Sequence, residues 1–134
     1  MEILLYKLKD VENIKDFLKI CNQLNLPLHI IKREKVDYDF IKDKKVQFYN
    51  SFEEFLEKNK NKKFLFFETY GDKHIFDINL KDFDIFVFGA EDYGIPIEII
   101  EKVKNKEVVK IPTKIPGSYN VVSSFIIFLT FYFS

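Results

Sequence analysis

Two patterns of apolar residues alternate along the chain, and they predict alternating strands and helices. Short apolar runs, of the length of buried strands, are followed by stretches with an apolar residue at every third or fourth position, as on one face of a helix. Between Val11 and Asn25, for example, Ile14, Phe17 and Cys21 have the helical spacing. Strands that alternate with helices predict an α/β fold, with a mostly parallel sheet covered by helices on both faces.

The predicted elements span the whole chain. The predicted strands are Glu2 to Leu8, Leu26 to Ile31, Phe64 to Glu68, Ile85 to Phe88 and Glu107 to Ile111. The predicted helices are Val11 to Asn25, a short helix that Ser51 opens and that ends before Lys58, Pro96 to Lys104, and Val121 to Phe133. The polar segments 32–47 and 69–84 are predicted to be irregular. Because no linker, low-complexity segment or repeat interrupts this pattern, residues 1–134 are predicted to form a single domain.

A candidate ligand loop follows one of the predicted strands. The segment F-V-F-G-A-E-D-Y-G-I-P, residues 86–96, is a buried apolar run that stops at Gly89 and continues through Glu91 and Gly94 into a helix-like pattern. Parallel sheets present their functional loops at the carboxyl ends of the strands, and glycine allows sharp turns and close approach to a ligand. Turn geometry alone also explains these glycines.

A second loop of the same kind follows the strand that ends at Ile111. In V-V-K-I-P-T-K-I-P-G-S-Y-N-V-V, residues 108–122, this loop carries Ser118 and Asn120 just before the helix predicted from Val121. Either side chain is suited to cap that helix, and capping alone is one explanation for both.

Composition narrows the class of protein. Apolar residues make up 47% of the chain and charged residues 31%, which is an ordinary globular composition. The 21 basic residues equal the 21 acidic residues in number, so any nucleic acid would have to bind at a local patch. The single cysteine, Cys21, excludes an internal disulfide, offers no metal cluster and suits the cytoplasm. The apolar run Phe125 to Phe133 is too short to cross a bilayer, which indicates a buried helix or a subunit contact.

Three segments together resemble the motifs of a known enzyme superfamily. The stretch E-N-I-K-D-F-L-K-I-C-N-Q-L-N-L-P-L-H-I-I, residues 12–31, has an Asn that opens a helix and a basic residue six positions later, here Asn13 and Lys19. This stretch and the two loops resemble motifs one, two and three of the SPOUT superfamily of RNA methyltransferases, in its SpoU/TrmH branch. The resemblance covers nearly the whole chain and is greatest to the small members that act on the tRNA anticodon loop.

The resemblance implies a fold and an assembly that periodicity does not reveal. In this superfamily the C-terminal segment threads through a loop to form a deep trefoil knot, a rare exception to the usual rules of chain connection. Family members also form homodimers, largely through the knotted region, and the phenylalanine-rich segment 121–133 would otherwise leave an unusually large apolar patch exposed.

The implied activity is transfer of a methyl group from S-adenosyl-L-methionine to a ribose 2′-hydroxyl of RNA, with tRNA expected in preference to rRNA. Motif-to-motif comparison places Phe67, Gly89, Ile111 and Ser118 around the cofactor. The charged segment 32–47 is interpreted in the first place as a solvated loop. It is also the best candidate for a surface that contacts RNA. We expect no metal ion and no membrane partner, because the chain offers no metal cluster and no apolar run long enough to cross a bilayer.

The resemblance also implies catalytic roles. Asn13 and Lys19 correspond to motif one, Glu91 to the acid of motif two, and Ser118 and Asn120 to the polar pair of motif three. We expect Lys19 to hold the target phosphate or to lower the pKa of the hydroxyl, and Glu91, with the two asparagines, to arrange the loop and the substrate. A plain surface acid is the alternative for Glu91.

Several positions depart from the family pattern. Lys19 stands where the family favours arginine, which keeps the charge but loses the planar fork that grips a phosphate. Tyr93 stands where a basic residue is common in the small members, and the loop of motif three is about one residue shorter. The alternative function is therefore a degenerate knotted protein that binds cofactor or RNA without transferring methyl groups.

Overall fold

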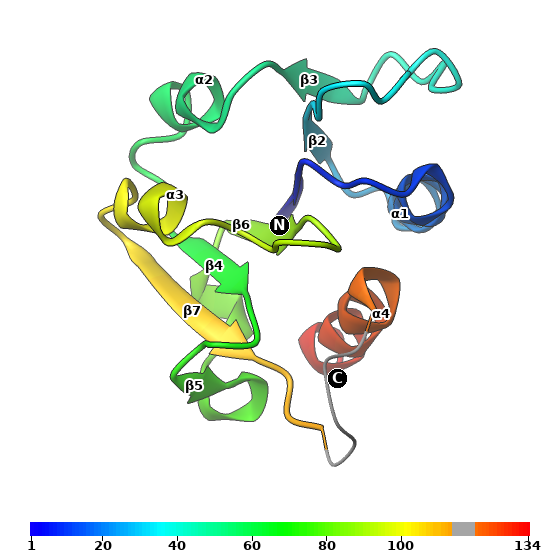
Figure 1. Ribbon diagram of the computed structural model, residues 1–134. Coiled ribbons are helices and arrows are strands. Elements are labelled where there is room, and N and C mark those ends of the chain that lie inside the picture. Colours follow the sequence, from blue (N-terminus) through cyan, green and yellow to red (C-terminus); the bar gives the residue numbers. More distant parts are fainter. Residues whose placement is uncertain (114–119) are drawn as a thin grey trace.

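Seven parallel strands form one sheet through the middle of the protein (Figure 1). The computed structural model describes residues 1–113 and 120–134. The strand order is β3-β2-β1-β6-β4-β7-β5, and every pairing is parallel. The strands are β1 Glu2–Tyr6, β2 Leu28–Ile31, β3 Gln47–Tyr49, β4 Phe64–Phe67, β5 Lys73–His74, β6 Ile85–Gly89 and β7 Lys106–Lys110.

Helices cover both faces of this sheet. On one face α1 (Val11–Leu24) lies beside α4 (Val121–Tyr132), and on the other face lie α2 (Phe52–Glu57) and α3 (Ile97–Glu101) (Figure 1). Two short 3₁₀ turns, η1 (Ile75–Asp77) and η2 (Leu80–Asp82), connect β5 to β6. The predicted α/β fold, with helices on both faces of a parallel sheet, is thus confirmed.

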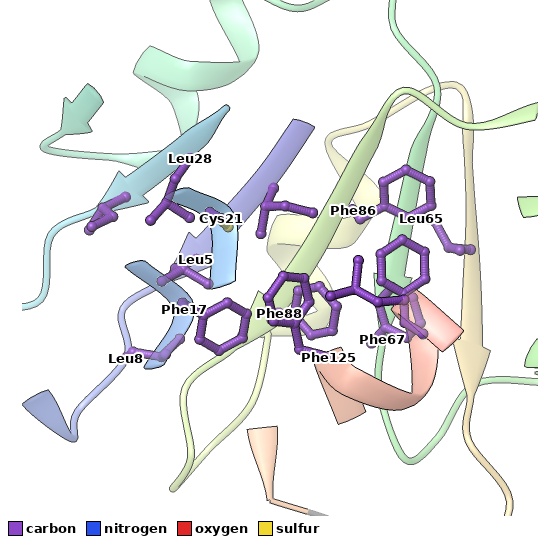
Figure 2. Close-up of a cluster of buried hydrophobic side chains, with 14 of the residues drawn as sticks. Leu5, Leu8, Phe17, Cys21, Leu28, Leu65, Phe67, Phe86, Phe88 and Phe125 are labelled. Atoms are coloured by element: carbon purple, nitrogen blue, oxygen red, sulfur yellow. The ribbon is translucent and has the colours of Figure 1, made fainter. Parts of the chain in front are cut away.

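Aromatic side chains fill the core on the α1 and α4 side. Phe17 of α1 stacks on Phe125 of α4 with ring centroids 4.4 Å apart, and both rings lie against Phe88 of β6 (Figure 2). Phe67 stacks on the same Phe88 at 4.6 Å. Because aromatic pairs contribute beyond the area they bury, this cluster fixes α4 over β6 rather than over β7, where the chain leaves the sheet.

The strand order reverses between β1 and β6. From β1 the chain proceeds outward to β2 and β3, whereas β4, β6 and β7 occupy the other half of the sheet. Ligands of open α/β sheets bind in the crevice outside the carboxyl ends of the strands at such a reversal. The loops after β1 and β6 flank this reversal, and the loop after β4 lies on the other side of the loop after β6.

The structure corrects several predicted boundaries. The first strand ends at Tyr6 because Lys7 has φ of 52°, and the first helix ends at Leu24 because Asn25 has φ of 54° and acts as its C-cap. Such left-handed conformations interrupt regular structure. The second strand begins at Leu28, after Pro27, which has no N–H to donate.

Two strands, β3 and β5, are missing from the predicted set: β5 lies in the segment 69–84 predicted to be irregular, and β3 begins at Gln47, the last residue of the segment 32–47. They have three and two residues, and Lys73 and His74 of β5 are polar, so neither strand shows the alternation from which a strand is predicted. Both are the edge strands of the sheet.

The C-terminal helix, which follows β7 in the chain, lies over the middle of the sheet. It contacts α1, β6 and η2. The connection to it runs through residues 114–119, which lie outside the described residues, so the predicted threading stays a prediction. No helix among the described residues is long and apolar enough to cross a membrane.

A buried polar network joins β1, β2 and β3. The ring of His29 lies 2.8 Å from Glu2 Oε1 through Nε2 and 3.0 Å from the Tyr49 hydroxyl through Nδ1, and Lys62 Nζ donates to Glu2 Oε2. Burial lowers the pKa of His29, although the neighbouring Glu2 opposes that shift. The pKa of Glu2 is also below its usual value: burial raises it, but the hydrogen bonds from Lys62 and His29 outweigh burial.

We predict that the free energy of unfolding falls as the pH is lowered from 7 to 5. Below about pH 6.5 the unfolded chain binds a proton at His29 that the folded chain binds only at lower pH, so acid favours unfolding. Below its own ordinary pKa, Glu2 adds to the loss for the corresponding reason. Urea denaturation across this range measures the effect.

The matched variants are His29→Gln, which removes the titrating ring, and His74→Gln, which leaves the network intact. We expect the pH dependence to become shallower in the first and to match the wild type in the second. Equal slopes in all three proteins would show that His29 is not the group responsible.

Candidate functional site

A cavity of about 570 Å³ opens at the carboxyl ends of β4, β6 and β7. Residues 67–70 after β4, residues 88–94 around the end of β6, and Ile111 after β7 line it, together with the first turn of α4. Small-molecule sites commonly have volumes of about 300–1,000 Å³. The site predicted from loops far apart in the sequence is therefore one continuous space.

Three of the four residues predicted to border a cofactor line this cavity. Phe67 and Ile111 contribute apolar surface, and Gly89 contributes backbone. A Cβ at Gly89 would lie 2.5 Å from Ile95 Cγ1 and 2.9 Å from the Gly94 carbonyl carbon, so the close approach of these backbones requires glycine. Ser118, the fourth, lies outside the described residues.

Glu91 fixes the loop after β6 to the start of α1. Its Oε1 accepts a hydrogen bond from the Lys9 N–H at 2.6 Å, and its Oε2 accepts from the Asp10 N–H at 3.0 Å and from Asn13 Nδ2 at 2.9 Å. The acid of motif two and the Asn of motif one are thus direct partners. Hydrogen bonds to an ionised acceptor are stronger than neutral ones, so Glu91 is more than a plain surface acid in this structure.

Asp92 ties the same loop to Arg33, two residues after the end of β2. Both Arg33 terminal nitrogens donate to its carboxylate, at 2.9 and 2.7 Å, and the Arg33 guanidinium holds the pKa of that carboxyl well below its usual range. The Arg33 guanidinium also lies 5.2 Å from the centre of the Tyr93 ring. The two neighbouring acids, Glu91 and Asp92, therefore hold one loop against two different segments.

The other two predicted catalytic residues differ in position. Asn120 lines the cavity and is the N-cap of α4, where its side chain accepts a hydrogen bond from the Ser123 N–H at 2.8 Å. Lys19 is exposed on α1 and is not among the residues that line the cavity. Six residues from Asn13 are about 9 Å along the helix and bring Lys19 to a different helix face.

The scan against protein families matches residues 1–130 to the SpoU rRNA Methylase family. The chain belongs to this family. The predicted membership in the SpoU branch is therefore confirmed over nearly the whole chain.

Individual relatives agree with this assignment. A protein of Listeria monocytogenes named "Putative tRNA (cytidine(34)-2'-O)-methyltransferase" is 27% identical, in an alignment that covers 82% of this chain and 72% of the relative. A structure described as a "putative RNA methyltransferase from Bacillus anthracis" is 26% identical, with a TM-score of 0.81 and coverage of 98% of this chain and 91% of the other.

Two further structures share the fold. One, described by the words "2-OH methylation of C/U34 on tRNA", has a TM-score of 0.84 at 20% identity and covers 98% of this chain and 93% of its own. The other is the SpoU methyltransferase AviRb from Streptomyces viridochromogenes, in complex with the cofactor AdoMet. It has a TM-score of 0.78 at 14% identity, and the match covers 97% of this chain and 55% of AviRb.

The sequence reasoning missed Glu68 as a residue of this SpoU-family site. Glu68 lines the cavity, its Oε1 accepts a hydrogen bond from the Ile95 N–H at 2.6 Å, and burial raises the pKa of its carboxyl. A Cβ at Gly94, whose φ is 69°, would collide with the Glu68 carboxylate. The available signal was an acid placed directly after the apolar run 64–67 at a carboxyl strand end.

We predict that Gly94→Ala lowers the free energy of unfolding by about 1–3 kcal/mol, because the new side chain must adopt a left-handed conformation and collides with Glu68. In a Glu68→Ala background, Gly94→Ala still forces a side chain into the left-handed conformation but no longer collides with the carboxylate. It should therefore be less destabilising there. Urea denaturation of the four proteins of this cycle gives the coupling energy. Additive costs would contradict the collision.

Proposed function

We propose that this protein transfers a methyl group from S-adenosyl-L-methionine to a ribose 2′-hydroxyl of tRNA, at anticodon position 34. The observation that carries the proposal is the single cavity in which Phe67, Gly89, Ile111 and Asn120 meet beside the Glu91 clamp, in a chain of the SpoU family. The position is proposed from the relatives whose names specify nucleotide 34.

The cavity suits an adenosyl group. Apolar walls from Phe67 and Ile111 can hold the faces of a purine, and the backbone around Gly89 and Gly94 approaches closely because these residues have no side chain. The half-buried carboxylate of Glu68 adds a negative charge, which suits a cationic ligand. When bound, S-adenosyl-L-methionine supplies an activated methyl group on a positively charged sulfur.

The work of this chain is orientation and proton handling. A ribose 2′-hydroxyl is a poor nucleophile because it holds its proton near neutral pH, so placement and proton acceptance govern the rate. We assign Glu91, which lines the cavity, to positioning, since it holds Asn13 and the start of α1 to the loop after β6. Asn120 borders the same space from α4, and Ser118 is proposed to stand with it.

Lys19 is assigned to the RNA rather than to the cofactor. It is an exposed cation on α1 outside the cavity lining, which suits contact with a phosphate next to the target nucleotide. The position of Lys19 outside the cavity also favours the alternative function, a protein that binds cofactor or RNA without transferring methyl groups, because Lys19 then brings no positive charge to the cavity. The assays below separate these two functions.

We further propose that the protein is a cytoplasmic homodimer with a C-terminal trefoil knot. Ile126, Phe131 and Phe133 of the C-terminal segment and the neighbouring Phe76 are 42% to 60% exposed and form what we call the α4 patch. A helix that is apolar on every side is normally covered, so α4 fits a subunit interface. A second copy of the chain is the proposed partner for this patch.

We predict that the purified protein transfers labelled methyl groups from S-adenosyl-L-methionine to tRNA. Total tRNA is incubated with protein and labelled cofactor, and the modified nucleotide is identified by mass spectrometry of nuclease digests. A 2′-O-methylated nucleotide at position 34 is expected. Cofactor binding without transfer to tRNA or rRNA would instead support the degenerate binder.

We predict that Lys19→Ala lowers kcat/KM for tRNA by about 10- to 100-fold, the loss of one charge-assisted phosphate contact, while the dissociation constant for the cofactor changes by less than about twofold. Lys19→Arg should restore activity, because arginine binds phosphate in two places. Lys60→Ala, which removes an exposed lysine paired with Glu57, is the matched control. Lost cofactor binding in Lys19→Ala would contradict the assigned role.

We predict that Phe131→Glu or Ile126→Glu converts the protein to a monomer in sedimentation velocity, because a buried unpaired carboxylate opposes association. Leu24→Glu makes the same change at an exposed apolar residue outside the α4 patch, and it should leave the dimer intact. A wild-type monomer at micromolar concentration would refute the proposed interface.

A further inference from the structure

The chain contains one arginine, Arg33, and its positive charge is paired with a carboxylate of the same chain. Both terminal nitrogens of Arg33 donate to the Asp92 carboxylate, and Nη1 also donates to the Lys7 carbonyl at 3.3 Å. The backbone N–H of Arg33 donates to the Tyr38 hydroxyl at 2.8 Å. Because its fork is filled and its charge is balanced, Arg33 is poorly placed to bind an RNA phosphate.

The loop that carries Asp92 is held in a single shape. Glu91 binds the start of α1 and Asp92 binds Arg33, while the Gly94 N–H donates to the Ala90 carbonyl at 2.8 Å to close the turn. A segment fixed at each of these points loses little conformational entropy when it binds a ligand.

Tyr93 is the side chain that this rigid loop presents at the cavity. It lines the cavity, half of it is exposed, and the Arg33 guanidinium lies 5.2 Å from its ring centre. A tyrosine that leaves half its surface in water at the mouth of a binding site is a common feature of surfaces that bind single-stranded RNA, because every base has a face that can stack on it.

We propose that Tyr93 is a stacking platform for a base of the RNA substrate, at or next to the nucleotide that is methylated, with Arg33 supporting the ring from behind. The proposal rests on the proposed function, since it names a contact between that site and its substrate. The guanidinium draws electron density from the ring face beside it, and Asp92 keeps it in place, so the contact depends on stacking rather than on net charge. Tyr93 is a binding residue here and takes no part in moving the proton.

The chain has no tryptophan, so Tyr93→Trp introduces a unique fluorophore at the site. We expect a single-stranded RNA oligonucleotide, and an RNA of the anticodon stem-loop, to quench the indole emission by stacking, with saturation in both titrations. Phe76→Trp, in the α4 patch, is the matched control and should show no saturable quenching. Equal responses from both variants, or none from Tyr93→Trp, would overturn the proposal.

Steady-state kinetics give a second measurement. Tyr93→Ala should raise KM for tRNA on the order of 10-fold and leave the dissociation constant for S-adenosyl-L-methionine within about twofold of the wild type, whereas Tyr93→Phe should retain the wild-type KM because it keeps the ring. An unchanged KM in Tyr93→Ala, or a weakened cofactor affinity instead, would refute the RNA contact.

The two measurements separate this proposal from the proposed function. If the wild type methylates tRNA but Tyr93→Ala has a normal KM, the stacking contact is wrong and the activity stands. If the wild type transfers no methyl group yet Tyr93→Trp is quenched by RNA, the stacking contact stands on a protein that binds RNA without modifying it.

Discussion

Two adjacent carboxylates shape the candidate site, because they bind the loop after β6 to two other segments. Glu91 accepts hydrogen bonds from the start of α1, and Asp92 forms a two-point ion pair with Arg33 after β2. The loop after β6, which lines the cavity, is thereby bound to the segments that follow β1 and β2. Without these bonds the residues of motifs one and two would lie on separate loops, each free to move.

The sheet makes this arrangement possible. Its strand order reverses between β1 and β6, so the loops after these strands diverge and leave a crevice that the carboxylates can bridge. The aromatic stack of Phe17, Phe88 and Phe125 then fixes α4 over β6, which brings Asn120 to the same cavity. The core and the site therefore depend on the same placement of α4.

Sequence reasoning predicted the parallel α/β fold, because buried strands give strong local signals. The resemblance to the SPOUT motifs, rather than any local pattern, predicted that Phe67, Gly89 and Ile111 would meet. It did not predict the ion pair with Arg33, which joins positions 59 residues apart. Contacts between side chains on different loops produce no regular spacing of residue types that could be recognised in a single sequence. The same reason explains why Glu68, apparent only as an acid after a strand, was missed.

Tyr93, which stands where the resemblance leads us to expect a basic residue, lies beside the only arginine of the chain. A basic side chain at position 93 would project positive charge from the loop after β6, whereas here the charge comes from Arg33 on another strand end and is balanced by Asp92. This loop therefore offers RNA an aromatic face backed by a bound guanidinium in place of a free cation. Such a surface loses little affinity at high salt, because stacking, unlike phosphate contact, releases few counterions.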